Sequence, residues 1–210
     1  MKKVLIFLFY FFLFNLHGQP LPDQSTLMAR APASFKAEFS TTKGKFIIEV
    51  YRDWSPAGAD RLYQLLTTRF YDNNGIFRVQ KPFVVQFGIG DNPEINKFWD
   101  KRPIPDEPVL EKNQKWTISY ARDGINSRTV QLFINLKDNP KLDTVNYNGL
   151  TGFPPVAKVI SGYETIDQLF GDYGFDPAKD QDTIMVQGNA FLKRKWPKLD
   201  YILDARIIEE

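Results

Sequence analysis

An arginine and a glutamine interrupt two short apolar runs near the middle of the chain. Arg78 lies in the run over residues 76–79 and Gln86 in the run over residues 83–87, and both runs are rich in the β-branched and aromatic side chains that favour strands. Arginine carries a permanent charge and five N–H donors, and a glutamine carbonyl can accept from it. The pair could hold a fixed donor against an atom that gains electron density during a reaction, without any proton transfer. The alternative is an ordinary strand arginine that faces water.

The composition excludes several other kinds of catalysis. The chain has no cysteine, and its one histidine, His17, lies in the N-terminal segment. Without these side chains the folded part cannot form a Ser–His triad, a Cys–His pair or an ordinary zinc site. The glycines of residues 88–93 lack the spacing of a nucleotide-binding loop, and Asp176, Asp180 and Asp182 lack the spacing of a calcium loop. We therefore expect no metal and no cofactor.

The first 18 residues have the pattern of a secretory signal peptide. Lys2 and Lys3 precede an apolar run over residues 4–14, and Gly18 follows soon after. The run is shorter than the roughly 20 residues of a membrane span. We expect cleavage near Gly18 and a mature protein that is periplasmic or secreted; the alternative is an uncleaved N-terminal anchor. No cysteine follows the run, which argues against a lipoprotein start.

Removal of this segment also changes the charge. Of the 27 Lys and Arg residues, the two lysines at positions 2 and 3 are lost, which leaves 25 against 25 Asp and Glu. A mature chain near neutrality gives no indication of a nucleic-acid or acidic-membrane partner. Roughly 190 remaining residues favour a single domain. We expect residues 19–34 to be a flexible leader and residues 35–210 to be that domain.

The patterning of the domain predicts mostly strands. Residues 35–51 alternate between apolar and polar side chains on both sides of a Gly-containing turn, as a β-hairpin does. A helix is expected after Ser55, as its N-cap, and Pro56, and a short one near residues 163–174. Loops are expected over residues 91–115 and 176–182.

Further strands are predicted over residues 116–121, 130–135 and 201–210. The order of elements lacks a regular βαβ alternation, which favours an antiparallel barrel or sandwich with two helices.

Two blocks of sequence together resemble the cyclophilins, the cyclosporin-binding class of peptidyl-prolyl isomerases. The block "FRVQKPFVVQFG" is similar to the family's Arg–x4–Phe–x2–Gln–x–Gly core, and "SYARDGINSRTVQLFI" resembles a second family block. The resemblance runs from about residue 35 to residue 160 and is weaker beyond. Residues 187–205 resemble an extension found in some longer bacterial members. The resemblance implies a closed antiparallel eight-stranded β-barrel with two flanking α-helices.

The same resemblance implies the roles of individual residues. Arg78 takes the place of the catalytic arginine, and Gln86 that of the glutamine that orients it. The positions that match the proline pocket are Phe83, Val84, Phe133 and Leu142. Those that match the groove beside it are Ala121, Arg122 and Gln131. Phe153 falls where many members have His or Tyr. Three departures occur. Lys141 stands where the family usually has an aromatic residue, which counts against cyclosporin binding. Phe87 replaces a common glycine, and the loop over residues 122–129 retains a glycine but otherwise differs from the common loop.

The resemblance implies a peptidyl-prolyl cis-trans isomerase that needs no cofactor and accelerates the folding of exported proteins. Its expected partners are Pro-containing segments of client proteins, and a monomer is expected. A second reading is a module that binds Pro-containing segments without turnover, and a third is an inert structural domain. The Arg78 and Gln86 pair favours the enzyme, because a scaffold has no need of it.

Overall fold

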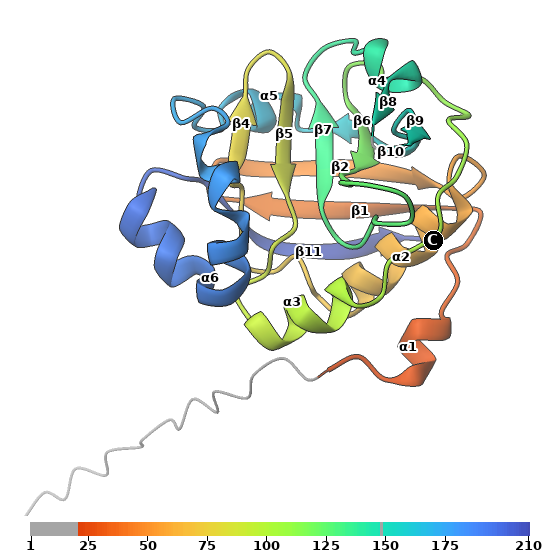
Figure 1. Ribbon diagram of the computed structural model, residues 1–210, viewed down its shortest axis with the longest axis horizontal. Helices are drawn as coiled ribbons and strands as arrows, with labels where there is room; N and C mark the ends of the chain where they lie inside the picture. Colours follow the sequence, from red (N-terminus) through yellow and green to blue (C-terminus); the bar gives the residue numbers. More distant parts are fainter. Residues whose placement is uncertain (1–20, 148) are drawn as a thin grey trace, which may run out of the picture.

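The computed structural model describes residues 21–147 and 149–210, and Figure 1 shows them as a curved sheet with helices around it. The helices, in chain order, are α1 (Gln24–Met28), α2 (Pro56–Thr67), α3 (Pro93–Asp100), α4 (Lys141–Thr144), α5 (Tyr163–Asp167), the 3₁₀ helix η1 (Asp176–Asp180) and α6 (Gln181–Lys195). The strands are β1 (Ser34–Thr41), β2 (Gly44–Tyr51), β3 (Asn74–Gly75), β4 (Arg78–Gln80), β5 (Val84–Phe87), β6 (Thr117–Tyr120), β7 (Leu132–Asn135), β8 (Asn146–Tyr147), β9 (Leu150–Thr151), β10 (Pro155–Ser161) and β11 (Tyr201–Glu209).

The N-terminal hairpin is confirmed with the predicted faces. β1 and β2 pair antiparallel from Ser34 opposite Tyr51 to Thr41 opposite Gly44. Gly44 has a φ of 130°, which a residue with a side chain rarely adopts, so glycine suits this tight turn. Along β1 buried side chains alternate with half-buried ones, and the apolar set is the buried one.

The main sheet differs in detail from the closed eight-stranded barrel that was expected. It has nine strands in the order β3-β11-β1-β2-β10-β6-β7-β5-β4, and β8 pairs with β9 in a separate two-stranded sheet. The end strands β3 and β4 are joined by only Ile76 and Phe77 instead of being paired to each other. The apolar run over residues 76–79 was expected to be one strand. It holds the junction between these end strands and the first residues of β4.

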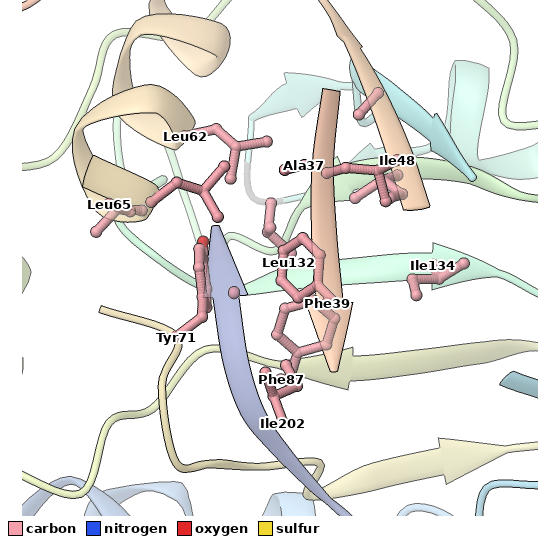
Figure 2. Close-up of a cluster of buried hydrophobic side chains, with 14 of the residues drawn as sticks. Ala37, Phe39, Ile48, Leu62, Leu65, Tyr71, Phe87, Leu132, Ile134 and Ile202 are labelled. Carbon is pink, nitrogen blue, oxygen red and sulfur yellow. The ribbon is translucent and has the colours of Figure 1, made fainter. Parts of the chain in front are cut away.

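Two hydrophobic clusters lie on either side of this junction. The larger one fills the curved sheet and includes Ile76, and Figure 2 shows part of it, with Phe39 of β1 beside Phe87 of β5. The smaller one includes Phe77 together with side chains of α6. Successive residues of the junction therefore anchor two different cores, which fixes the backbone that leads into Arg78.

Helix α2 begins at Pro56 as expected, but its N-terminus is capped differently. Ser55 makes no side-chain capping bond to the helix. The carboxylate of Glu107 instead accepts from the backbone N–H groups of Ala57 and Gly58, at 2.7 and 3.3 Å, and from the Ser55 hydroxyl. A carboxylate stabilises the orphan N–H groups and positive end of a helix even when it comes from a distant segment.

Helices also occupy both segments that were expected to be loops. Residues 91–115 contain α3, which has Asn92 as N-cap and Pro93 as its first residue. Residues 176–182 contain η1 and the start of α6, so the flanking helices number more than two. Helix α6 is kinked at Gly188 (φ 56°, ψ −148°), where the Asn189 N–H donates to Asp91 at 2.7 Å.

The segment expected to be a flexible leader, residues 19–34, contacts the domain through its later part. Gln64 of α2 donates to the carbonyls of Leu27 and Ala29, at 3.1 and 3.0 Å, and Ala31 is buried. The expected signal peptide, residues 1–18, lies outside the described residues. Among the helices of the described ranges, none has both the length and the apolar character needed to cross a membrane.

Candidate active site

The pairing of β4 with β5 brings the two polar interruptions together. Arg78 lies directly opposite Gln86 in the register, so both side chains project from the same face. The guanidinium donates from Nη1 to Gln86 Oε1 at 3.0 Å. Gln86 is buried and donates in turn from Nε2 to Gln131 Oε1 at 2.9 Å. The sequence therefore predicted the Arg78–Gln86 contact correctly, and Gln131 extends it to β7.

Gln80 is a second anchor of the guanidinium that sequence reasoning missed. Its Oε1 accepts from Arg78 Nε at 3.2 Å and from Nη2 at 2.7 Å. Residues two apart on a strand share a face, so the alternation from Arg78 to Gln80 was the signal that could have found it. Three of the five N–H groups of Arg78 are thus engaged. Among the described residues, the other two have no hydrogen bond to a protein acceptor.

The expected proline pocket is assembled beside this donor. Phe133 is buried and lies edge-on to Phe153, with ring centroids 5.8 Å apart. The Phe153 N–H donates to the Leu142 carbonyl at 2.8 Å, which ties the loop after β9 to α4. Phe83 and Val84 line the same cavity as these three residues. The structure therefore brings together all five predicted pocket residues, Phe153 included.

The expected groove residues extend this cavity across β7 to the end of β6. Ala121, Arg122 and Gln131 all line it. Arg122 is buried, and its guanidinium lies 4.6 Å from the Phe153 ring centroid and donates to the carbonyls of Leu150, at 3.3 Å, and Gly152. Arg122 therefore braces the wall of the pocket as well as lining the groove.

The whole cavity has a volume of about 610 Å³ and is lined by both polar and apolar side chains. Its lining includes further residues that sequence reasoning did not single out, namely Asp100, Pro103, Asp123, Asn126, Ser127, Thr129, Phe175 and Gln181. Phe175 and Gln181 come from the segment before and within α6. No pattern in the sequence places that segment beside β4, because the contact is made across nearly a hundred residues of chain.

Two aromatic rings flank the guanidinium of Arg78. Its Cζ lies 5.5 Å from the Phe83 ring centroid and 4.8 Å from that of Phe175. Burial lowers the pKa of Arg78 from its ordinary value, because removal from water disfavours the charged form. An arginine starts so high that it stays protonated at neutral pH. The guanidinium of Arg78 is therefore a partly desolvated cation, and the two rings restrict the orientation of its plane.

A buried ion pair fixes the loops beside the groove. Arg128 is buried and donates to Glu107 at 2.9 Å and to the Pro105 carbonyl. The same Glu107 caps α2, so one carboxylate joins that helix to two loops.

Lys141, the noted departure, is exposed at the start of α4. Across residues 21–147 and 149–210 there is no group of three His, Cys, Asp or Glu that could hold a metal ion.

Comparison with known families accounts for this arrangement. The model of the family "Cyclophilin type peptidyl-prolyl cis-trans isomerase/CLD" matches residues 36–187. That range covers most of the chain and all of the pocket and groove residues predicted above. The chain belongs to the cyclophilin-type peptidyl-prolyl cis-trans isomerase family.

Individual relatives agree with this assignment. The chain is 30% identical to peptidyl-prolyl cis-trans isomerase-like 3 of Homo sapiens, over 61% of this chain and 78% of the relative. It is 28% identical to a peptidyl-prolyl cis-trans isomerase of Streptomyces antibioticus, over 64% and 82%. A Schizosaccharomyces pombe relative, peptidyl-prolyl cis-trans isomerase 9, is 29% identical over 58% of this chain, which spans only 21% of that longer protein.

A solved structure supports the fold. The crystal structure of a cyclophilin-type peptidyl-prolyl cis-trans isomerase from Cryptosporidium parvum superposes with a TM-score of 0.59 at 19% identity, over 84% of this chain and 99% of the other. A further crystal structure of that protein was determined in the presence of the dipeptide Ala-Pro.

Proposed function

We propose that this protein accelerates X–Pro isomerisation in exported proteins as they fold, and that Arg78 stabilises the twisted amide. The observation that carries the proposal is the guanidinium of Arg78, held by Gln80 and Gln86 beside an apolar pocket. Family membership supports the reaction class, and the geometry supports the role of the arginine.

The chemistry follows from amide resonance. Isomerisation must cross a barrier of roughly 18–20 kcal/mol, because twisting the C–N bond breaks the delocalisation of the nitrogen lone pair. The lone pair then returns to the prolyl nitrogen, which becomes a hydrogen-bond acceptor only as the twist develops. A fixed N–H of Arg78 that points at this atom binds the transition state more strongly than the ground state, which is the requirement for catalysis. No proton is transferred, so the site needs no histidine.

The apolar residues hold the part of the substrate that must not move. The pyrrolidine ring packs between Phe83, Phe133 and Leu142, while the acyl side of the bond turns over Gln131 and Ala121. Phe153 closes the pocket against Phe133. A crystal structure of the Cryptosporidium relative determined with Ala-Pro supports a dipeptide of this kind as the minimal probe.

The test is prolyl isomerisation of an X–Pro peptide by residues 19–210, beside the Arg78→Ala and Arg78→Lys variants. Loss of a preorganised donor is expected to lower kcat/KM by about 100- to 1000-fold. Lysine is expected to rescue little, because it lacks the planar fork that Gln80 and Gln86 hold. Circular dichroism checks that the variants are folded. Wild-type activity retained in Arg78→Ala would refute the role of this residue.

The second candidate is a binding module for Pro-containing segments without turnover. The departures at Lys141, at Phe87 and in the loop over residues 122–129 motivate it, and Lys141 is exposed where the family usually has an aromatic residue. A folded wild-type protein that binds Pro-peptides but accelerates none, across several residues before proline, would favour this candidate.

Export is a separate part of the proposal. It rests on the basic start and the apolar run of residues 4–14. Expression of the whole chain in a bacterium, followed by cell fractionation and N-terminal sequencing, tests it. A periplasmic or secreted product that begins near Gln19 supports export, and an unprocessed product in the cytoplasm contradicts it.

A further inference from the structure

Phe175 is an exposed aromatic residue just before the 3₁₀ helix η1. Its side chain is 45% exposed, whereas Pro177 and Ala178, two and three residues later, are buried, and Ala178 belongs to the smaller hydrophobic cluster. Phe175 lines the same cavity as the proline pocket, and its ring is 4.8 Å from Arg78 Cζ. Its position in the cavity lining, beside Arg78, would let its large apolar face contact a ligand in the groove.

The segment that carries Phe175 is fixed to the edge of the sheet. Gly174 forms an antiparallel bridge with Val79 of β4. On the other side, Tyr173 lies edge-on to Trp196, with centroids 5.0 Å apart, and Trp196 Nε1 donates to Asp180 at 2.9 Å. These contacts hold the ring of Phe175 beside Arg78 without burying it, so little ordering is needed when a ligand binds.

Strand order gives the groove a direction. Its residues come in turn from the end of β6, from β7, from β5 and from β4, and Phe175 follows beyond β4. Ala121 and Arg122 therefore lie at one end and Phe175 and Gln181 at the other, with the proline pocket and Arg78 between them. A peptide whose proline occupies the pocket presents its neighbouring residue on one side to Phe175.

We propose that Phe175 forms a subsite that selects an aromatic or large apolar side chain next to the proline, at the Arg78 end of the groove. This inference rests on the proposed isomerase function and deepens it by naming the preferred substrate class. The ring supplies the apolar surface, and Gln181 borders it on the segment side.

Two peptide series test this subsite. One varies the residue before proline and the other the residue after it, each as Phe, Leu, Ala or Lys. The proteins are the wild type, Phe175→Ala, Phe175→Tyr and, as a matched control, Val186→Ala, which removes an exposed apolar side chain of α6 outside the groove lining. In one series the wild type is expected to favour Phe over Ala by about three- to tenfold in kcat/KM, as an aromatic pair would give.

The variants separate a subsite from a support for Arg78. The Phe-over-Ala ratio should fall to near one in Phe175→Ala and persist in Phe175→Tyr and Val186→Ala. An unchanged ratio in Phe175→Ala, or an equal loss of rate with every peptide, would overturn the proposal. The same peptides are also titrated by calorimetry. If the wild type shows no turnover, the isomerase function is refuted. The subsite is refuted if Phe175→Ala leaves the ratio of Kd between the Phe and Ala peptides unchanged.

Discussion

The hydrogen bonds of Arg78 are unequally shared between its two glutamine partners. Gln80 accepts two of them and Gln86 one, and Gln86 is the more buried. Gln86 also donates to Gln131, and this hydrogen bond fixes the position of the Gln86 carbonyl that accepts from Arg78. Gln80 sets the rotation of the guanidinium plane, because it bonds Nε and Nη2 together. The two partners therefore define the direction of the free N–H groups jointly.

Gln80→Ala is expected to lower kcat about tenfold while KM for the peptide changes little. The variant keeps the charge of Arg78 but removes two charged hydrogen bonds that orient it. Steady-state or line-shape measurements that separate kcat from KM check this result. Gln114→Ala, which truncates an exposed glutamine outside the groove lining, is the control. Full kcat in Gln80→Ala would show that Gln86 alone suffices.

The isomerase rate is expected to be flat from about pH 6 to pH 9. Burial lowers the pKa of Arg78, so the cation would be lost only as pH rises toward that pKa. An arginine stays protonated far above pH 9, and the groove lining contains no histidine or cysteine. A pH series with an uncharged peptide tests this prediction. A bell-shaped profile within this range would point to a proton-transfer step that the site does not explain.

At the scale of elements, the sequence predicted what is periodic and local. The hairpin of β1 and β2, the start of α2 at Pro56 and the strands that carry Arg78 and Gln86 follow from alternation and helix-start signals. Contacts between distant segments were missed, because no local pattern encodes them. Glu107 replaces Ser55 as the cap of α2 from about fifty residues away, and Phe175 reaches Arg78 from beyond α5.

Glu107→Ala is expected to destabilise the protein by about 3–5 kcal/mol. Removal of this carboxylate leaves the buried Arg128 without its charged partner and the N-terminus of α2 without its cap. Urea unfolding should show a lower midpoint with an unchanged slope. Glu111→Ala, at an exposed position nearby, should stay within about 0.5 kcal/mol of the wild type. Equal midpoints for the two variants would contradict the assigned role.

At the scale of the whole molecule, the closed barrel was the expectation that differed most. A pattern of strands gives their number and faces, but closure depends on whether the two end strands meet. Here β3 and β4 are consecutive in the chain, and the two residues between them face two different cores. The nine strands form eight pairs, and the two end strands are linked by the chain itself and not by a further strand pair.

The balance of charge over the described part of the chain leads to a prediction about association. Residues 21–210 carry equal numbers of basic and acidic side chains, because both lysines outside this range lie at positions 2 and 3. Net long-range attraction is then absent, so kcat/KM for an acidic peptide should change less than about twofold between low and high salt. Stopped-flow measurements at several NaCl concentrations check it. A steep decrease with salt would reveal local steering by the arginines of the groove.

The bridge between Val79 and Gly174 has a consequence for the proposed action on unfolded chains. An uncovered edge strand offers unpaired backbone groups, and an extended polypeptide can add to it as a further strand. β4 is the end strand of the sheet and carries Arg78, so a client captured there would block the groove. The segment before α6 covers this edge. A bound polypeptide therefore contacts side chains in the cavity and does not add to the sheet as a further strand.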